Sequence, residues 1–455
     1  MRDLFFVAYL AVLLGFGLKR PFIFVLAYAY VDIVAPQRLS YYMLNAIPIS
    51  LVVAALAVGG WLLSDDKKGL RLAPRQALMI AMLAYAGFTT LNADLPVEAL
   101  TKWDWVWKAM AFAIFLPFTL RTRLRIEAYL LFMVLSAAAI VIVGGLKTLA
   151  SGGGYGVLNL MVDNNSGLYE SSTISTVAIA MIPLILWLGR FGTVFPRDWR
   201  VRLFVAALVF ACLLMPVGTQ ARTGLICIGL LVILMLRDAK RRLVYIGMIG
   251  AAGLIAIPFL PASFTGRMQT IQTYQADSSA ATRIAVWGWT WNYVKDHPGG
   301  GGFEAYRQNR ITVQTTSAPG ADGGVGTARV GEDAGRAYHS SYFEMLGEQG
   351  FPGIAMFLLL HIAGLVRMEV LRRRYRRAGE ADAWIAPLAT ALQNGQLVYL
   401  VGSLFVGIAW QPFIYMLIAV QIGLDMYLGQ RERLGRKEPF VRPQPSKSQM
   451  AKASR

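Results

Sequence analysis

Long apolar runs recur along this chain and constrain its fold more than any other feature of the sequence. Runs of roughly 17–25 residues with few charges fill most of its 455 residues, and about 20 apolar residues in a helix cross about 30 Å of hydrocarbon. Too many of these runs lack a polar face for a soluble helical core. Charged residues make up 15% of the chain, against about 25% in ordinary soluble domains. The sequence therefore predicts an all-α polytopic membrane protein.

Thirteen apolar segments are candidate membrane crossings, and because several are short we predict about twelve transmembrane helices. The first two segments are the ones expected to form a hairpin or an incomplete crossing. The thirteen segments are residues 4–17, 22–34, 44–63, 77–91, 105–120, 128–143, 173–188, 203–217, 225–236, 243–260, 354–366, 385–408 and 413–428.

Lys and Arg gather in short connections between the apolar runs, which is how a membrane protein records its orientation. These basic connections alternate with connections that are poor in Lys and Arg, so we expect the basic ones in the cytoplasm. The net charge of +18 then reflects membrane topology, and we expect no nucleic-acid partner. The basic stretches are residues 65–75, 121–125, 190–202, 237–242 and 367–377.

The same pattern divides the chain into four parts. Residues 1–261 are expected to form an N-terminal transmembrane bundle, and residues 343–430 the C-terminal transmembrane helices. Between them, residues 262–342 are polar and are expected to form one large loop on the far side of the membrane, which is the periplasm if the host is a Gram-negative bacterium. Residues 431–455 are basic and contain Pro and Ser, which predicts a disordered cytoplasmic tail.

The large loop combines a helical pattern with a glycine-rich stretch. Aromatic and aliphatic residues recur at helical spacing over residues 282–298, which predicts an amphipathic helix. Residues 317–335 are rich in glycine and are expected to be mobile. A polar segment this long in a compact chain is usually functional or disordered, and the helix, the arginines and a histidine favour a functional one.

His339 lies at the end of the loop, where the next helix is expected to begin. An unperturbed histidine titrates near pH 6.5 and can accept a proton from a hydroxyl group. The alternative for His339 is a capping or interfacial polar residue. His297 precedes a glycine-rich turn, which favours a histidine at a helix C-terminus, and His361 lies within an apolar run, where packing and function are equally open.

Several arginines lie on the side of the membrane where the positive-inside rule disfavours them. Arg222 falls in a polar break between two apolar runs, and Arg283 opens the amphipathic helix. A guanidinium group matches phosphate with paired, planar hydrogen bonds, so these residues indicate an anionic ligand. The alternatives are lipid headgroups or internal carboxylates such as Asp277 and Glu332. The other arginines of the loop are Arg267, Arg307, Arg310 and Arg336.

Other kinds of site have little support in the sequence. Carboxylates such as Asp163 and Glu344 are isolated and are not spaced as a cage for a divalent ion. The glycine-rich stretch lacks the G-K-[ST] ending of a P-loop, and neither G-x-S-x-G nor H-E-x-x-H occurs. Cys212 and Cys227 lie within apolar runs, where a thiol acts as a small core residue. We therefore expect no metal and no cofactor.

Three motifs, in this order along the chain, resemble those of the O-antigen ligase and polymerase superfamily of bacterial envelope enzymes. "GTQARTG" (218–224) resembles a Ser/Thr-x-x-Arg-x-Gly element between two helices. "TRIAVWGWTWNYVKDHPGGGGFEAY" (282–306) resembles an Arg…Trp…His-Pro-x-x-Gly-x-Gly segment, and "YHSSYFEMLGEQGFPG" (338–353) resembles a His-Asn/Ser-x-Tyr/Phe…Glu-x-Gly-x-x-Gly segment. The resemblance covers roughly residues 163–408. Gln220 and Ala221 stand where many relatives carry Ser, and Ser340 where many carry Asn.

The resemblance implies transfer of a glycan from undecaprenyl pyrophosphate at the periplasmic face of the membrane. We expect a hydroxyl of lipid A–core as the acceptor, in lipopolysaccharide biosynthesis, with membrane lipids around the site. A protein O-oligosaccharyltransferase or an O-antigen polymerase of the same superfamily is the alternative. A flippase for a lipid-linked glycan is a different class, but it would carry charge inside its helices, whereas here the arginines gather in one outer loop.

The expected catalytic residues are His339, Arg222 and Arg283. The two arginines are expected to hold the pyrophosphate and stabilise the charge that develops as it leaves, while His339 accepts the proton of the attacking hydroxyl in an inverting, metal-independent displacement. Arg336, Arg267 and Tyr342 are expected to contribute to substrate binding. The residues that could orient the imidazole are Tyr338, Tyr342 and Glu344.

Overall fold

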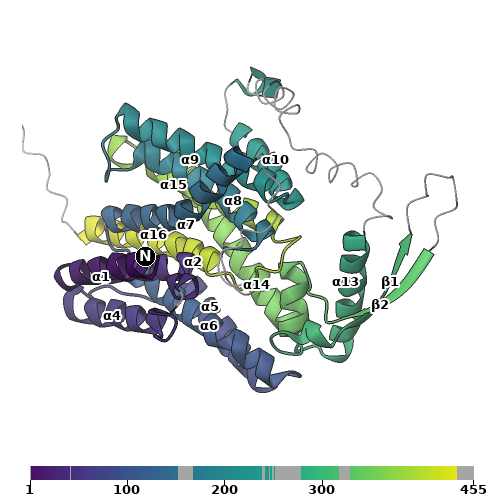
Figure 1. Ribbon diagram of the computed structural model, residues 1–455. Coiled ribbons are helices and arrows are strands. Elements are labelled where there is room, and N and C mark those ends of the chain that lie inside the picture. Colours follow the sequence, from purple (N-terminus) through teal and green to yellow (C-terminus); the bar gives the residue numbers. More distant parts are fainter. Residues whose placement is uncertain are drawn as a thin grey trace, which may run out of the picture.

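Long helices form most of the molecule, and a small unit of one helix and one β-hairpin lies at one end of them (Figure 1). The computed structural model describes residues 2–40, 42–151, 168–237, 241–244, 246–247, 251, 278–316 and 328–437. Asp163, Arg267 and Asp277 lie outside the described residues. The α-helices are α1 (Arg2–Lys19), α2 (Phe22–Val34), α3 (Pro36–Leu39), α4 (Ile49–Ser64), α5 (Pro74–Leu91), α6 (Pro96–Phe115), α7 (Arg123–Ser151), α8 (Ser171–Phe191), α9 (Trp199–Gly218), α10 (Arg222–Leu236), α13 (Ser278–Asp296), α14 (Ser341–Arg374), α15 (Ile385–Gly402) and α16 (Pro412–Lys437); short 3₁₀ turns occupy Leu116–Phe118, Ala305–Gln308 and Glu380–Asp382.

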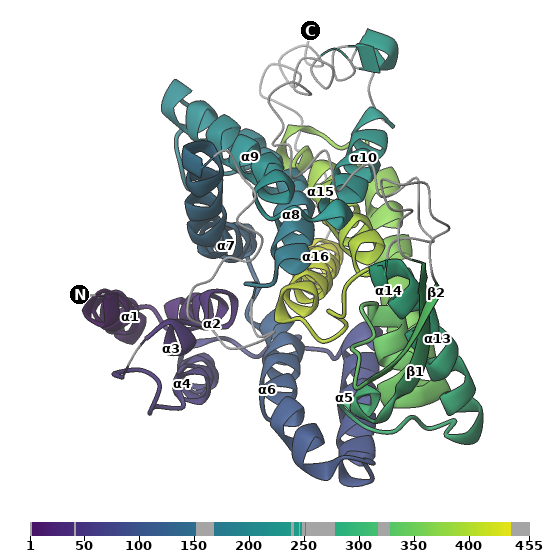
Figure 2. The ribbon, with the colours of Figure 1, turned by 45° about the vertical axis from the view of Figure 1, so that its right-hand side comes forward.

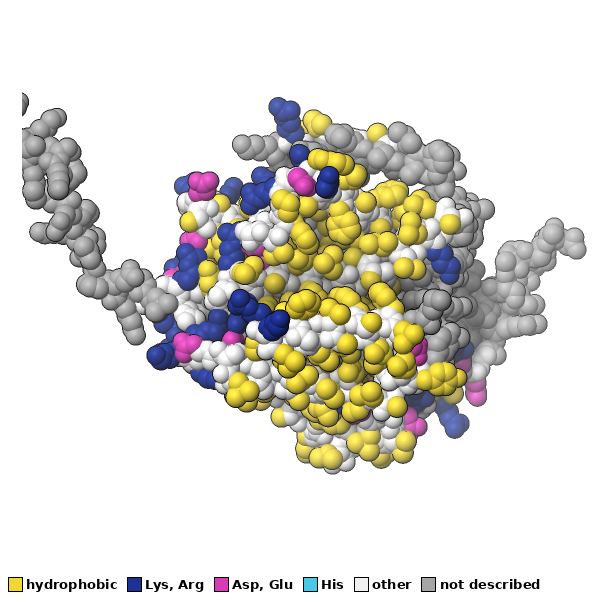
Figure 3. All heavy atoms as spheres, turned by 60° about the vertical axis from the view of Figure 1, so that its left-hand side comes forward, with side chains coloured by type: hydrophobic (Ala, Val, Ile, Leu, Met, Phe, Trp, Pro, Cys, Tyr) yellow, Lys and Arg dark blue, Asp and Glu magenta, His cyan; other side chains and the backbone are white. Residues whose placement is uncertain are grey.

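Five of the described helices are long and apolar enough to cross a membrane: α7, α8, α9, α14 and α16. Three shorter apolar helices, α2, α4 and α10, accompany them. Apolar side chains cover much of one face of the bundle, and Lys and Arg side chains gather along its margin (Figure 3). The prediction of a helical, multi-pass membrane protein is confirmed in this form, and the number of about twelve crossings stays a prediction.

The basic connections meet at one end of the bundle, which we call the basic end. Arg125, at the start of α7, donates a hydrogen bond to Asp65 in the connection between α4 and α5 (Nη2–Oδ1 2.7 Å). On α14, Arg367 lies 2.5 Å from a carboxylate oxygen of Asp425 on α16. Segments that the charge pattern assigned to one side of the membrane are therefore also together in space.

The connections that are poor in Lys and Arg meet at the opposite end, which we call the loop end. The connection between α5 and α6 bonds to the turn after α13, since the Asp94 amide donates to the Gly301 carbonyl (2.9 Å). The start of α14 bonds to the end of α15, since the Ser341 amide donates to the Ser403 carbonyl (2.8 Å). Figure 2 shows α13 and the hairpin beside α14 and α5 at this end.

The predicted amphipathic helix is present as α13, but the hairpin beside it was not predicted. Strands β1 (Arg310–Thr316) and β2 (Ala328–Ala334) pair antiparallel, with Arg310 opposite Ala334 and Thr316 opposite Ala328. The expected mobile stretch 317–335 is therefore wrong for residues 328–334, and residues 317–327 lie outside the described residues. The strand β2 contains Ala, Gly, Glu and Asp, which are poor strand formers, so its conformation depends on its pairing with β1.

Two helices extend beyond the segments expected from hydropathy. The helix α14 begins at Ser341, before the apolar segment 354–366, and it is interrupted at Gly350, where φ is 62° and ψ is −163°. The helix α16 runs to Lys437, past the start of the expected tail at residue 431. Arg431 contacts Asp382 there (2.8 Å), which holds the end of α16 against the connection between α14 and α15.

Candidate functional site

His339 occupies a strained position directly before α14. Its φ is +48°, in the left-handed region that few residues other than glycine enter, although histidine is enriched there. Ser340 follows in extended conformation as the N-cap residue of α14. The backbone therefore turns sharply at His339, and this residue is exposed at the loop end. Strained backbone of this kind is concentrated at functional sites.

The surroundings of His339 lower the pKa of its imidazole ring. The packed protein around the ring lowers the pKa of His339 by removing water from the charged form, and the nearby guanidinium groups of Arg283 and Arg336 lower it further. Glu170, at the start of α8, acts in the opposite direction. The structure thus places Arg283, Arg336 and Glu170 close enough to His339 to act on its pKa, and the sequence analysis did not identify this carboxylate. The catalytic and binding roles expected for the site residues stay predictions.

Arg336 is held through its backbone as well as its side chain. Asn309 is completely buried; its Oδ1 accepts from the Arg336 amide (3.0 Å), and its Nδ2 donates to the Arg336 carbonyl (2.6 Å). The Arg336 guanidinium pairs with Asp333 on β2 (2.5 Å). The internal-carboxylate alternative therefore applies to this arginine, and it applies also to Arg307, which bonds to Glu304 (2.9 Å).

Arg222 lies in a tight turn between α9 and α10 at the same end of the bundle. Gln220 adopts a φ of +54° in this turn, and the Thr219 hydroxyl bonds to the Ser175 hydroxyl on α8 (2.8 Å). A methyl group on Gly224 would lie 2.4 Å from Pro216, so the turn is closed by direct contact. Arg222 is the first residue of α10, at the N-terminus of this helix.

The turn of Arg222 is connected to the start of α14 through two helices. Next to Ser175 on α8, Thr176 packs so tightly on Gly402 of α15 that an added methyl group there would lie 2.4 Å from its side chain. The next residue, Ser403, accepts the amide hydrogen bond of Ser341. The helices α8, α10, α14 and α15 thus meet within a few residues of both Arg222 and His339.

The glycine-rich turn after α13 fits directly against the break in α14. Gly300 has a φ of +84°, and a methyl group on it would lie 2.4 Å from the Gly350 amide nitrogen. In the other direction, a methyl group on Gly350 would lie 2.1 Å from the Pro298 carbonyl. Only residues without a side chain permit this approach, which explains why both motifs carry glycine at these positions.

This contact also accounts for the backbone groups that the break would leave unbonded. In an unbroken helix the carbonyls of Gly347 and Glu348 would accept from residues 351 and 352, but Pro352 has no N–H group. The amides of Gly301 and Gly302 donate to these two carbonyls instead (3.0 and 2.9 Å). The turn therefore replaces the missing helical hydrogen bonds and fixes the loop on α14.

A buried cluster of charges lies beneath the turn. Lys102 of α6 bonds to Glu344 and Glu348 of α14, both at 2.7 Å, and lies 3.9 Å from Glu304. Glu344 is isolated from other carboxylates along the sequence, but in space it shares Lys102 with Glu348, and the two carboxylates lie 242 and 246 positions from this lysine in the chain. In the part of the chain that the structure describes, no group of three or more His, Cys, Asp or Glu residues is arranged to hold a metal ion.

The three residues considered as partners of the imidazole make other contacts. The Tyr342 hydroxyl donates to the Leu400 carbonyl (3.0 Å), and the Glu344 carboxylate accepts from the Ala409 amide (2.9 Å). Tyr338 is 3% exposed and packs edge-on against Tyr306. The Tyr338 carbonyl accepts a hydrogen bond from the Trp287 indole (2.8 Å). The backbone directly before His339 is therefore anchored to α13.

The other two histidines have structural contacts. His297 follows the last residue of α13 and stacks on Tyr293 (centroids 4.4 Å apart), which confirms the prediction of a helix C-terminal histidine. His361 is buried in α14, and its Nδ1 lies 3.0 Å from Nε2 of Gln396 on α15. Cys212 and Cys227 are buried free thiols, as expected.

Two family models match the chain. Residues 1–193 match a family of unknown function (DUF5935), and residues 206–358 match the O-antigen ligase family. Residues 206–358 belong to the O-antigen ligase superfamily. All three motifs that carried the resemblance lie within this ligase region. No curated protein matches the chain.

Membership of the superfamily supports an enzyme of the ligase or polymerase type in a multi-pass membrane protein. The ligase region supplies His339, Arg283, Arg336 and Arg222. Two residues that the sequence analysis missed, Lys102 and Glu170, come from residues 1–193, so both parts of the chain build this end of the molecule.

A weak signal for Glu170 was present in the sequence. Glu170 precedes Thr173 by three residues, and its Oε2 accepts from the Thr173 amide (2.6 Å) as the N-cap of α8. An acidic residue before an apolar run marks a helix start, and the alternation of loops would have assigned that start to the loop end. Lys102 had no comparable signal, because its partners come from distant parts of the chain.

Proposed function

We propose that this protein transfers a glycan from undecaprenyl pyrophosphate to a hydroxyl of lipid A–core at the periplasmic face of the inner membrane, with inversion and without a metal ion. The loop end faces the periplasm in this proposal, and the basic end faces the cytoplasm. The observation that supports the proposal is an exposed histidine close to the guanidinium groups of Arg283 and Arg336, which lower its pKa together with desolvation.

The reaction follows from the chemistry of these groups. The acceptor oxygen attacks the anomeric carbon as the bond from that carbon to the pyrophosphate oxygen breaks, and the electron pair of that bond stays on the pyrophosphate. A neutral nitrogen of His339 takes the proton of the hydroxyl, which typically contributes about 10²–10⁴-fold. Arg222 and Arg283 stabilise the departing pyrophosphate, and loss of one preorganised donor typically costs about 10²–10³-fold.

A lowered pKa suits His339 to this task. A histidine that held its proton near neutral pH could not accept another, so the desolvation and the arginine charges that lower the pKa of His339 keep it ready as a base. The same arginine charges attract the anionic donor. Binding of the pyrophosphate would in turn offset those charges and favour the protonated imidazole that forms during the reaction.

The test is transfer in proteoliposomes that contain a synthetic lipid-linked oligosaccharide and lipid A–core. His339→Asn tests the base, because asparagine tolerates a positive φ but its amide does not take a proton; we expect transfer to fall by about 10²–10⁴-fold. Arg222→Ala and Arg283→Ala should each fall by about 10²–10³-fold. The matched control is His297→Asn, on the same loop but stacked on Tyr293, which should keep wild-type activity.

Two further arms separate the alternatives. Lipid A–core, a Ser/Thr-containing protein and a second lipid-linked glycan are offered separately, and the accepted one decides between ligase, oligosaccharyltransferase and polymerase. A donor that changes leaflet but is not consumed indicates a flippase. Wild-type transfer by His339→Asn, or activity lost in a chelator and restored by a divalent ion, would overturn the mechanism.

A further inference from the structure

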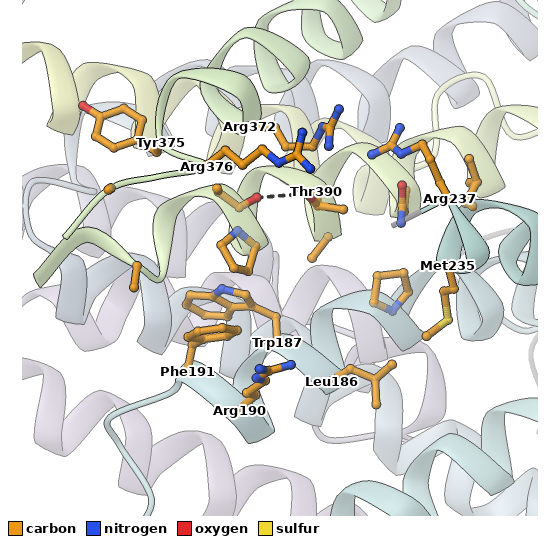
Figure 4. A pocket seen from close by; sticks show the side chains of 18 residues that line it. Leu186, Trp187, Arg190, Phe191, Met235, Arg237, Arg372, Tyr375, Arg376 and Thr390 are labelled. Carbon is orange, nitrogen blue, oxygen red and sulfur yellow. Dashed lines mark hydrogen bonds between the residues drawn. The ribbon is translucent and has the colours of Figure 1, made fainter. Parts of the chain in front are cut away.

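A cavity of about 820 Å³ opens at the basic end, far along α8, α14 and α15 from His339. It lies where α8, α10 and α14 end and where α15 begins. Its lining includes four arginines, Arg190, Arg237, Arg372 and Arg376, and none of the described residues that line it is Asp or Glu. The guanidinium groups approach from different sides: Arg190 lies on α8, Arg237 after α10, and Arg372 and Arg376 at the end of α14 (Figure 4).

Three of these arginines have contacts in the described part of the chain, and one of the three is Arg190, whose guanidinium lies over the Phe191 ring (5.4 Å to the centroid). The described side chains that line the cavity nevertheless carry a net positive charge. Arg372 bonds to Glu369 on its own helix (2.8 Å), and Arg237 has a long hydrogen bond to the Gln393 side chain (3.4 Å). Arg190 and Arg376 are exposed. Glu369 pairs also with Arg373 (2.6 Å), so its single negative charge is shared between two cations. The charge around the cavity therefore fits an anion.

The other wall of the cavity is apolar. Leu186 and Trp187 of α8 and Leu234 and Met235 of α10 line it, and Figure 4 shows Leu186 and Met235 below the guanidinium groups of Arg237, Arg372 and Arg376. On the adjoining surface of α10, Ile233 is 67% exposed, as expected for a helix that faces lipid. A ligand that fills this site thus needs an anionic group next to an apolar chain.

Arginines at these positions also have a simpler role, which does not account for the cavity. Cations near helix C-termini complement the helix dipole, and the positive-inside rule favours them on this side. Both effects act on each arginine separately and are satisfied by side chains that point into water. They do not require four guanidinium groups from three helix ends around one cavity with an apolar wall. Basic pockets between transmembrane helices on the cytoplasmic side bind anionic lipid headgroups.

We infer that this cavity binds one anionic glycerophospholipid of the cytoplasmic leaflet. Its phosphate lies among Arg190, Arg237 and Arg376, and its acyl chains follow the apolar wall of α8 and α10. The lipid would hold together the ends of α8, α10 and α14 at the basic end. This inference does not depend on the transfer reaction proposed for the loop end.

The experiment uses the full-length protein, purified in detergent and stripped of lipid. Thermal unfolding is followed while phosphatidylglycerol, phosphatidylcholine of the same acyl chains, or inorganic phosphate is added, and native mass spectrometry counts the lipids retained. We expect one phosphatidylglycerol to be retained and to raise the unfolding midpoint, while phosphatidylcholine has a much smaller effect. With both Arg237→Gln and Arg376→Gln, we expect phosphatidylglycerol to bind about 10–30-fold more weakly, from the usual contribution of each basic residue near an anionic headgroup.

The matched control is Arg197→Gln with Arg200→Gln, because both residues are exposed at the basic end but do not line the cavity. This control should bind phosphatidylglycerol within about twofold of wild type, since exposed single charges contribute little. Equal binding of the two lipids, or equal loss in both double variants, would overturn the inference. Stabilisation by millimolar inorganic phosphate equal to that by phosphatidylglycerol would also overturn it, since the site would then bind a free anion.

Discussion

Replacing Lys102 by methionine tests the buried charge cluster below the glycine-rich turn. Lys102 is 10% exposed and lies 2.7 Å from carboxylate oxygens of both Glu344 and Glu348, whose side chains are 8% and 0% exposed. Removing one partner of a buried ion pair typically costs about 3–5 kcal/mol, because the remaining charge stays buried. Since two short contacts are lost together, we expect Lys102→Met to lower the free energy of unfolding by at least about 3–5 kcal/mol.

Lys108→Met is a matched control on the same helix. Lys108 pairs with Asp104 at 2.8 Å, but Asp104 is 68% exposed, and pairs of this kind contribute about 0–1 kcal/mol. The free energy of unfolding is measured by SDS titration in dodecylmaltoside micelles, followed by tryptophan fluorescence. Adding Glu348→Gln to Lys102→Met should recover part of the loss, because it removes one of the unpaired charges. Equal stability of the two lysine variants would show that the cluster is not desolvated and would refute this reasoning.

Three further predictions concern the loop end and the N-terminal helices. The acid limb of the kcat/KM profile should move to higher pH in Arg283→Gln and to lower pH in Glu170→Gln, because the cation lowers and the anion raises the pKa of His339, and only the neutral ring accepts a proton; limbs that stay in place, or move together, would exclude His339 as the base. Asn309→Ala should cost about 1–3 kcal/mol of stability and reduce transfer, because the two hydrogen bonds of the buried Asn309 side chain to the Arg336 backbone are lost, whereas the exposed Asn292→Ala should change neither. Ala35→Gly should raise stability by about 0.5–1 kcal/mol in the same SDS titration, because Ala35 has a φ of +50°, while Ala57→Gly within α4 should lower it by about 1 kcal/mol.

Hydropathy and charge predicted most of the bundle, because both are local properties of the chain. The apolar segments 128–143, 173–188 and 203–217 lie within α7, α8 and α9, and the helical spacing of residues 282–298 gave α13. The strand β1 also carried a local signal, since Ile311 and Val313 alternate with polar residues. The strand β2 did not, because pairing rather than propensity determines it.

The site was predictable only where a local motif carried it. His339 and Arg283 stand in segments whose residue types indicated their chemistry, and the structure brings them together. Lys102 and Glu348 were not predictable as a pair, since neither has an unusual neighbourhood in the sequence and their contact depends on how α6 packs on α14. The role of Gly350 was likewise hidden, because only the approach of the Gly300 backbone explains it.

The glycine-rich turn after α13 is hydrogen-bonded to the interrupted part of α14, so the position of the loop depends on the position of that helix. Transmembrane helices tilt when bilayer thickness changes, and a loop attached only by side chains would lag behind such a movement. Here the amides of Gly301 and Gly302 are bonded to carbonyls of α14 itself, so the glycine-rich turn follows any tilt of this helix. Because these bonds involve only main-chain atoms, neighbouring side chains are free to diverge while the glycines are not.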